Sequence, residues 1–334
     1  MKIKASPPRA PTLEDVARAA GLSAMTVSRA LNVPQQVRAQ TLARVMEAVR
    51  ATGYIPNALA GGLASRRSRL IAVVVPQINN AMFVDTIQAL NDEMVRQGYQ
   101  MLLCVSGYQA ESEAEIVATL LSRRPDGIIL TGIHHTPALK KMVLQAALPV
   151  VEIWDMTPTP IDMLVGFSHQ QVGAEVGDYL IQRGYRKPAL LWADDARAAQ
   201  RRQGLEARLR RQQIAIVAQI AVPLPASMQG GRDAFAALDD AAVDVVVCSS
   251  DTIAQGALIE AEARGRRVPQ DVAVMGFGDL AFAAAHRPAI TTVRIDRQAI
   301  GQQAVRALLA RLAGDAVPQP VTDIGFEIIQ RDSA

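Results

Sequence analysis

Short apolar runs alternate with longer amphipathic segments from Leu70 to the end of the chain. The runs are LIAVVVP, MLLCVS, GIILT and PVVEI, followed in the same rhythm by PALLWA, IAIVAQIAV, DVVVCSS and DVAVMGF. Strands of a parallel sheet are buried on both faces and therefore appear as continuous apolar runs, with helices between them. The pattern predicts an α/β fold built from doubly wound parallel sheet.

Helical periodicity fills the intervals between these runs. We expect helices at residues 82–97, 111–123, 137–146, 169–183, 197–212, 228–238, 252–264 and 296–313. More than one lobe is needed to hold so many βα units, and the natural break lies near Val165–Ser168. The sequence therefore predicts two α/β lobes.

The first 69 residues differ from the rest in charge. They hold eleven Lys/Arg against three Asp/Glu, a balance of +8, whereas the whole chain is +3 and the remainder is therefore −5. A small basic head joined to a larger acidic body is typical of a protein whose head binds a polyanion.

Three short helical patterns occupy this head. Thr12 and Asp15 form a T-x-x-D capping box before the first pattern, and Ser23 is expected to cap a second helix that runs to about Leu31. A third helix is expected at residues 39–51, with Gly53 just after it.

The stretch GLSAMTVSRALN contains the second helix, and it carries little apolar surface. Val27 and Leu31 are one turn apart and can hold the helix against the other two. The outward face would then carry Ala24, Met25, Ser28 and Arg29. Two helices joined by a tight glycine turn form a helix-turn-helix, whose second helix enters the major groove of DNA. The alternative is a three-helix cap with a solvated arginine.

The residue types on that face suit DNA. An arginine can donate two hydrogen bonds to guanine O6 and N7, and small apolar side chains can contact a thymine methyl group. Thr26 and Ser28 can bind phosphates and fix the register, which carries no sequence information.

Signatures of catalysis are absent from the sequence. It has no phosphate-binding loop, no G-x-G-x-x-G after a strand, no G-x-S-x-G and no H-E-x-x-H motif. Its four histidines, His134, His135, His169 and His286, are interpreted as surface or loop residues. The two cysteines, Cys104 and Cys248, lie in apolar runs and are interpreted as buried thiols, with no metal. We expect ligand binding without turnover and without a cofactor.

The chain start, MKIKASPPRAP, is basic but lacks the apolar region of a signal peptide, and no run approaches the ~20 apolar residues of a membrane span. We therefore expect a cytoplasmic protein that contacts no membrane.

Together these motifs resemble a known family. PTLEDVARAAGLSAMTVSRALN followed by GYIPNALAGGLA is similar to the head and hinge of the lactose-repressor (LacI–GalR) family of bacterial regulators. The similarity continues through RRPDGIIL, SSDTIAQGAL and VPQDVAVMGFGD, so it covers essentially the whole chain. In its middle the chain most resembles the gluconate-utilisation repressors, through GYQAESEAEI, ILTGIHHTPALKKM and PIDMLVGFSHQQ.

The resemblance implies a specific architecture. Residues 1–56 would form the DNA-binding head and residues 57–69 a hinge helix and linker. Residues 70–167 with 298–325 would form the first effector-binding lobe, and residues 168–297 with 326–334 the second, both of periplasmic-binding-protein type. The family also implies a homodimer, or a tetramer of dimers, that binds double-stranded DNA at a pseudo-palindromic operator.

The resemblance also assigns DNA contacts. It places Ala24, Met25 and Arg29 at the bases, and at the backbone Thr12, Leu13, Thr26, Ser28 and Thr41. In the hinge it implies Asn57 and Ala60, with Leu63 as a wedge in the minor groove. Gly61 and Gly62 disfavour an isolated helix there, so we expect this segment to fold only on DNA. Arg38 replaces the serine that usually caps the third helix of the family.

For the effector, the resemblance implies a site that includes Asn79, Phe83, Asp155, Arg201, Ser250, Asp251, Gly278 and Asp279. Arg201, three residues before Gly204, matches the family's ligand anchor, with Arg202 as the alternative. The position after MGF is commonly an aspartate that binds neutral sugar hydroxyls, and here it is Gly278, although Asp279 follows.

Loss of a carboxylate beside a retained arginine favours an anionic ligand. We therefore expect gluconate or a close relative, such as 2-ketogluconate or 6-phosphogluconate, to act as inducer. The alternatives are a neutral or phosphorylated sugar as effector, or a sugar-acid-modifying enzyme with an appended DNA-binding head.

Overall fold

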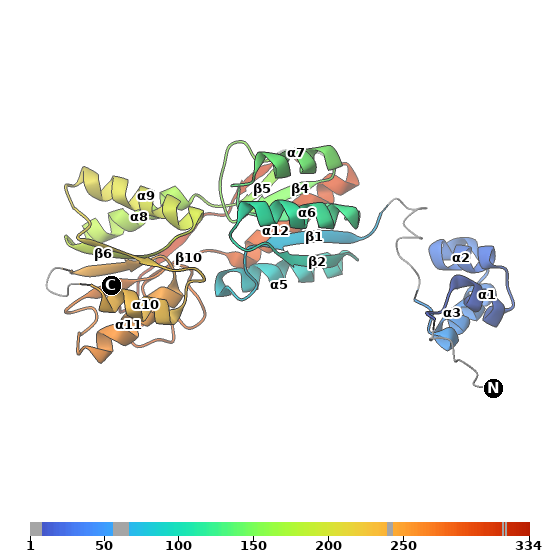
Figure 1. Cartoon of the computed structure of the whole chain (residues 1–334), viewed down its shortest axis with the longest axis horizontal. Coiled ribbons are helices and arrows are strands. Elements are labelled where there is room, and N and C mark those ends of the chain that lie inside the picture. The colour runs from blue at the N-terminus through green and yellow to red at the C-terminus, as the bar shows by residue number, and fades with distance from the viewer. Residues whose placement is uncertain (1–8, 56–66, 239–242, 316, 318) are drawn as a thin grey trace, which may run out of the picture. The chain divides into compact units, whose positions relative to one another are not determined.

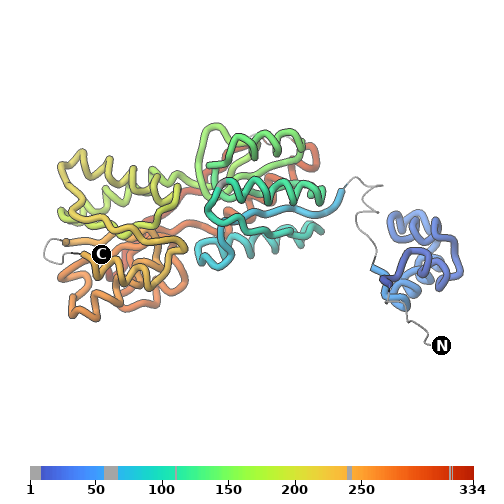
Figure 2. The backbone as a smooth tube through the Cα atoms, in the orientation of Figure 1, coloured from blue at the N-terminus to red at the C-terminus, as the bar shows by residue number. Residues whose placement is uncertain are grey.

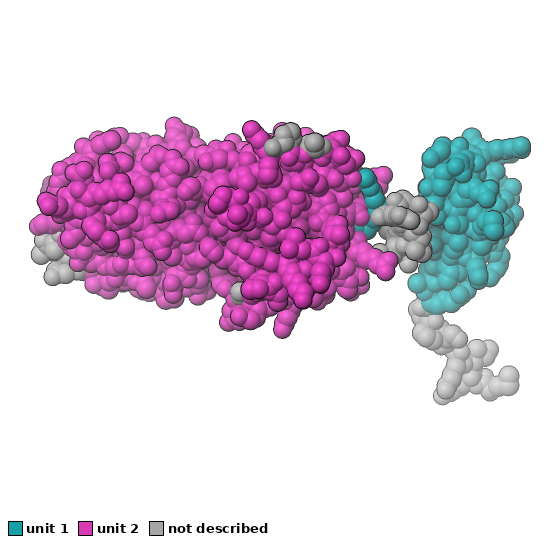
Figure 3. Space-filling model, turned by 90° about the horizontal axis from the view of Figure 1, so that it is seen from above, with its two compact units in different colours: residues 1–68 teal, residues 69–334 magenta. Residues whose placement is uncertain are grey.

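The computed structural model describes residues 9–55, 67–238, 243–315, 317 and 319–334. The chain forms two compact units, residues 1–68 and residues 69–334, which Figure 3 shows in different colours.

The first unit contains three α-helices and one 3₁₀ turn among its described residues: α1 (Leu13–Ala20), α2 (Ala24–Asn32), η1 (Pro34–Gln36) and α3 (Ala39–Thr52). Their common core is built on Val16, Val27 and Val45, each fully buried. Arg44 of α3 donates to the carbonyl of Ala20 at 2.7 Å, which ties the end of α1 to α3.

Local caps fix the boundaries of these helices as the sequence predicts. The Thr12–Asp15 capping box is present, and the Ser23 hydroxyl accepts from the Thr26 amide. Gly21 at the turn between α1 and α2 has φ +59°, in the left-handed region that favours glycine. Arg38 makes no side-chain cap bond to α3, as its departure from the family pattern predicts.

A six-stranded, wholly parallel sheet forms the centre of one half of the second unit (Figure 1). Its order is β11-β5-β4-β3-β1-β2. The strands are β1 (Leu70–Val75), β2 (Gln100–Val105), β3 (Gly127–Thr131), β4 (Val150–Ile153), β5 (Met163–Gly166) and β11 (Val321–Asp323). The flanking helices are α5 (Ala81–Arg96), α6 (Ala110–Ser122), α7 (Pro137–Ala146) and α12 (Arg297–Ala313).

Alternate side chains of β1 show how this sheet is buried on both faces. Ile71 and Val73 join the core beneath α5 and α12, whereas Ala72 and Val74 join the core beneath α6 and α7. A continuous apolar run is what such two-sided burial requires. Although α12 and β11 come from the end of the chain, they pack with its earlier part, as the red and blue-green segments of Figure 2 show.

The other half is organised around a four-stranded parallel sheet of order β7-β6-β8-β9. Its strands are β6 (Pro188–Ala193), β7 (Ala218–Val222), β8 (Val245–Cys248) and β9 (Ala273–Met275). Four helices cover it, α8 (His169–Gln182), α9 (Ala196–Arg211), α10 (Met228–Ala236) and α11 (Asp251–Ala263). A separate antiparallel ribbon pairs β10 (Thr292–Arg294) with β12 (Glu327–Ile329).

One predicted strand is too long. The apolar run of residues 214–222 forms strand only from Ala218, because Gln213 adopts a left-handed backbone (φ +59°) that ends α9. Before this strand, the Val217 amide donates to the carbonyl of Pro188, the first residue of β6. Ile214 is apolar because it is buried in the core, 8 % exposed, and not because it pairs in the sheet.

Candidate DNA-reading helix and interlobe cavity

The outward face of α2 is the first candidate site. Met25 is 72 % exposed and Arg29 is also exposed, whereas Val27 and Ala30 are buried against α1 and α3. A helix needed only for the core would not place a thioether and a guanidinium together in solvent. In Figure 1, α2 lies above α1 and α3 in the view.

The other predicted contacts of the head have different environments. The Thr12 hydroxyl accepts from the Asp15 amide in the capping box of α1. The Ser28 hydroxyl accepts from the side-chain amide of Asn32 at 3.2 Å. Thr26 shares a hydrogen bond with Ser23 at 2.8 Å. The remaining three predicted contacts, Leu13, Ala24 and Thr41, are half-buried. Each lies in the first turn of a helix, α1, α2 and α3 respectively. The hinge residues Asn57, Ala60 and Leu63 lie outside the described residues.

A cavity of about 390 Å³ lies between the two sheets of the second unit, and its walls come from both halves. We name it the arginine compartment, and its lining includes Asn79, Phe83, Tyr108, Trp154, His169, Arg197, Arg201, Ser250 and Phe277. The polar groups stand among aromatic rings, as in sites for small polar molecules.

Close packing of two helices sets the position of Arg201. A Cβ on Gly204 of α9 would lie 1.9 Å from the Gln170 carbonyl oxygen, and a Cβ on Gly173 of α8 would lie 1.8 Å from the Arg201 carbonyl oxygen. Only glycine permits this approach, which brings Arg201 against the first residue of α8, His169.

His169 and Arg201 form a buried pair. Arg201 Nη1 donates to His169 Nδ1 at 3.0 Å, and His169 Nε2 donates to the Trp154 carbonyl at 2.9 Å. Burial, followed by the Arg201 charge, holds the pKa of His169 well below its usual range, so the imidazole is neutral and Nδ1 can accept. Burial lowers the pKa of Arg201 to about 10, which still leaves it charged at neutral pH.

The aromatic wall fixes the other side of the guanidinium. Arg201 Cζ lies 3.9 Å from the centre of the Phe277 ring, and Nη2 donates to the Ser249 carbonyl at 3.0 Å. Trp154 meets Phe83 edge-on at 5.3 Å, and its indole donates to Thr86 Oγ1 at 3.2 Å.

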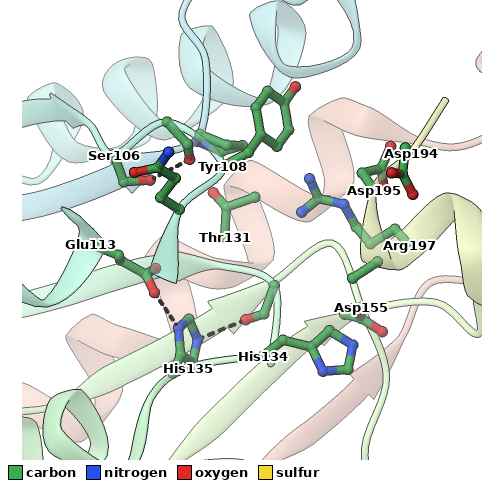
Figure 4. Close-up of a pocket in the computed structure, with 15 residues that line it drawn as sticks. Ser106, Tyr108, Glu113, Thr131, His134, His135, Asp155, Asp194, Asp195 and Arg197 are labelled. Carbon is green, nitrogen blue, oxygen red and sulfur yellow. Dashed lines mark hydrogen bonds and ion pairs between the residues drawn. The ribbon is translucent and has the colours of Figure 1, made fainter. Parts of the chain in front are cut away.

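A second cavity of about 220 Å³ adjoins the first, and Tyr108, Asp195 and Arg197 line both. We name it the carboxylate compartment after the further acidic residues in its lining, Glu113, Asp155 and Asp194 (Figure 4). Burial raises the pKa of Asp155, which is fully buried and accepts from the Met156 amide at 2.9 Å.

Two buried histidines, His135 of this compartment and His169 of the arginine compartment, correct the interpretation of the histidines as surface groups. His135 is buried, with Nδ1 2.8 Å from Glu113 Oε2, and His169 is 1 % exposed. His134 and His135 line the same compartment although they are adjacent, because they lie in the loop before α7 and not on a helix.

Five predicted effector residues line the two compartments and three do not. Asn79, Phe83, Arg201 and Ser250 line the arginine compartment, and Asp155 lines the carboxylate compartment. Asp251, Gly278 and Asp279 are outside the lining of both cavities in the described structure.

Each of those three has another role. Asp251 is fully buried, where it accepts from Thr292 Oγ1 at 2.6 Å and from the Leu280 amide at 2.7 Å, and burial raises its pKa to about 6. Asp279 is paired with Arg331 at 2.6 Å and with Arg294 at 2.7 Å. A Cβ on Gly278 would lie 2.3 Å from Met82 Sδ, so Met82 fills the space that a side chain would occupy.

The sequence analysis missed several residues of the cavity, among them Arg197, His169 and Trp154. Arg197 lies four residues before Arg201 and therefore on the same face of α9, a spacing that a sequence can show. Of the two arginines considered as the anchor, Arg201 faces the cavity, whereas Arg202 lies 3.5 Å from Glu206 and lines neither compartment.

Other kinds of site receive no support within the described part of the chain. No group of three or more His, Cys, Asp or Glu side chains there is arranged to hold a metal ion. No helix there is long and apolar enough to span a membrane. Cys104 and Cys248 are free thiols.

Both units of the chain match models of known families. Residues 12–57 match the model of the bacterial regulatory proteins of the lacI family, and residues 68–324 match that of the periplasmic binding proteins and sugar binding domain of the LacI family. The chain is 35 % identical over 327 residues to the HTH-type transcriptional regulator GntR of Pseudomonas aeruginosa, covering 97 % of this chain and 95 % of that one.

Solved structures agree over nearly the whole chain. A transcriptional regulator of the LacI family from Silicibacter pomeroyi superposes with a TM-score of 0.91 at 30 % identity, covering 97 % of this chain and 99 % of that one. The lac repressor dimer bound to operator and the anti-inducer ONPF gives a TM-score of 0.82 at 26 % identity, with coverage of 97 % and 99 %. The protein described here belongs to the LacI family and is a DNA-binding transcriptional regulator with a sugar-binding domain.

Proposed function

We propose that this regulator is a repressor whose affinity for its operator is controlled by a sugar acid of the gluconate class. The acid binds in the arginine compartment and acts as inducer, and the protein catalyses no change in it. The observation that carries the proposal is Arg201, a charged side chain only 6 % exposed in the wall of a cavity between the lobes.

Charge distribution supports an acid over a neutral sugar. The carboxylates of Asp251 and Asp279 do not reach the cavity, because neighbouring side chains hold them elsewhere. Gly278 has no side chain that could reach it. Asp195, the one carboxylate in the lining of the arginine compartment, accepts from the Ala198 amide as the cap of α9. The arginines therefore dominate, and guanidinium binds carboxylate or phosphate through paired hydrogen bonds.

The identity of the acid rests on relatives. Regulators that match nearly the whole chain carry the name GntR, and the middle of the sequence resembles the gluconate-utilisation repressors. These similarities favour gluconate over other acids of the same charge.

On DNA, we propose a homodimer whose two heads read a pseudo-palindromic operator. Arg29 and Met25 project from α2 and supply base contacts, and the residues numbered 57–69 act as the hinge. The lac repressor, which shares the fold along the chain, was solved as a dimer bound to operator. A protein of this kind works in the cytoplasm, where its DNA is.

Isothermal titration of the full chain tests the effector. We expect gluconate to bind at least about tenfold more tightly than glucose, since one charge-assisted hydrogen bond is sufficient for such a difference. Arg201→Ala should abolish binding, whereas Arg202→Ala, the matched change on the same helix, should leave it intact. Equal affinities for gluconate and glucose would refute the choice of an acid.

Two further measurements distinguish gluconate from a phosphorylated effector, and a regulator from an enzyme. Tighter binding of 6-phosphogluconate than of gluconate would make a phosphorylated sugar acid the effector. Disappearance of the acid on prolonged incubation with the protein would show an enzyme with a DNA-binding head.

A further inference from the structure

Arg197 stands where the two compartments meet. It lies in the first turn of α9 and lines both cavities, and Figure 4 shows its guanidinium directed into the space on the side of Thr131 and Tyr108, away from the carboxylate of Asp194. Its Cζ lies 5.3 Å from the centre of the Phe83 ring and its charge opposes the rise that burial causes in the pKa of Asp155, but no hydrogen bond or ion pair of its guanidinium is found in the described structure. Its hydrogen-bond donors are therefore available to a ligand.

Arg201 differs in this respect. Two of its nitrogens already donate, one to His169 and one to the Ser249 carbonyl, and its Cζ lies over the ring of Phe277. Its Nε is buried without a partner. Arg201 supplies positive charge at a fixed place, but much of its hydrogen-bonding capacity is used within the protein.

Charges of opposite sign are sorted on the two sides of Arg197. On one side is Arg201 with the neutral imidazole of His169, and on the other are the carboxylates of Glu113, Asp155 and Asp194. Asp195 lines both sides, but its carboxylate accepts from the Ala198 amide as the cap of α9. An anionic group is repelled by the second side and attracted by the first. Hydroxyl groups, which donate hydrogen bonds, suit the carboxylates of the second side.

We infer that Arg197 selects the acid effector and sets its direction in the cleft. The acid group lies in the arginine compartment between Arg197 and Arg201, and the hydroxylated chain extends past Arg197 into the carboxylate compartment. The ligand class is thus an extended polyhydroxy acid. This inference rests on the proposed function, because it assumes that a sugar acid occupies the cleft.

The same position joins the two lobes. Arg197 belongs to α9 in the second lobe, whereas Phe83 belongs to α5 in the first. An acid bound to Arg197 contacts groups of both lobes only when the lobes are this close. Its binding energy therefore favours the closed arrangement over a more open one.

Titrations of the full chain with gluconate, glycerate and sorbitol test the selection step. Glycerate keeps the acid but lacks most of the chain, and sorbitol keeps the chain but lacks the acid. Arg197→Gln should weaken gluconate and glycerate roughly tenfold to a hundredfold and leave sorbitol unchanged. Arg197→Lys should recover part of the loss, because charge is kept without the planar fork. Arg202→Gln, a charge change in the same helix outside both cavities, should have little effect.

Asp155→Asn tests the direction of the chain. It should weaken gluconate several-fold and leave glycerate unchanged, because only the longer acid reaches the carboxylate compartment. Equal losses for both acids would overturn the direction. Undiminished gluconate binding by Arg197→Gln would overturn the inference and leave the gluconate proposal standing, whereas failure of wild-type protein to bind either acid would refute the proposed function itself.

Discussion

His169 Nδ1 accepts a hydrogen bond from Arg201 Nη1 at 3.0 Å in a site where both side chains are almost completely buried. The contact needs a neutral imidazole with its proton on Nε2, and the Trp154 carbonyl, 2.9 Å from Nε2, provides the acceptor for that proton. His169, which begins α8 where the chain passes from one sheet to the other, thus holds the Arg201 guanidinium in place.

This pair predicts a pH dependence of stability. The pKa of His169 is lower in the folded chain than the usual value of about 6.5 in the unfolded chain, so the unfolded state binds the proton more readily. The stability that this residue contributes is complete above about pH 6.5 and falls as the pH decreases below it, by at most about 1.4 kcal/mol per pH unit.

Denaturant unfolding of wild type and His169→Asn at pH 7.5 and 5.5 measures this effect. The difference in unfolding free energy between them should shrink at the lower pH. Asp251, whose pKa is raised to about 6, changes stability in the opposite direction but is shared by both proteins and cancels in the comparison. A difference that stays constant with pH would contradict the neutral imidazole.

The close approach of α8 and α9 makes Gly204 intolerant of any side chain. Gly204→Ala places a methyl group 1.9 Å from the Gln170 carbonyl oxygen, so the helices must separate. We expect a loss of about 1–3 kcal/mol or more in unfolding free energy. Gln203→Ala, at an exposed position on the same helix, is the control and should be nearly neutral. Similar losses for the two variants would show that the helix contact is not tight.

Asp279 is predicted to stabilise the fold without touching the effector. Its carboxylate bonds Arg331 and Arg294, with side-chain exposures of 11 % for Asp279 and 14 % for Arg331. Asp279→Asn should lower the unfolding free energy by about 1–3 kcal/mol and leave the dissociation constant for gluconate within about twofold. Asp233→Asn offers a control, because that exposed carboxylate accepts from the side-chain amide of Gln229 on the same helix and its loss should change stability little. A large loss of effector affinity in Asp279→Asn would place that carboxylate in the binding site.

Arg29 is predicted to read a base. Arg29→Ala should cost about 1–3 kcal/mol per half-site and relax the preference at one base position. The comparison is between operator and random DNA, titrated with wild type and variant at one salt concentration. Equal losses on both DNAs would mean that Arg29 contacts only phosphate.

Most of the fold could be predicted from the sequence because its rules are local. The continuous apolar runs of β1, β3 and β8 mark strands buried on both faces, and Thr12 and Ser23 mark helix starts through their own hydroxyl groups. The prediction of a single strand over residues 214–222 was wrong, because residues buried in the core and residues paired in a sheet are both apolar in the sequence.

The cavity was less predictable because it depends on contacts between distant residues. The sequence shows carboxylates at 251 and 279, but not that Thr292, Arg294 and Arg331 turn them away from the cavity. It also shows His169 only as a polar residue after a strand. Its burial follows from the glycine contact that brings α9 alongside α8.

Release of operator DNA by a sugar acid tests the central claim most directly. A pseudo-palindromic duplex selected in vitro with the full chain would be titrated by fluorescence anisotropy, with and without saturating gluconate. We predict that gluconate raises the dissociation constant for the duplex roughly 5- to 150-fold, the usual range of coupling between two sites, and that glucose at the same concentration does not. Unchanged or tighter DNA binding in the presence of bound gluconate would contradict the account.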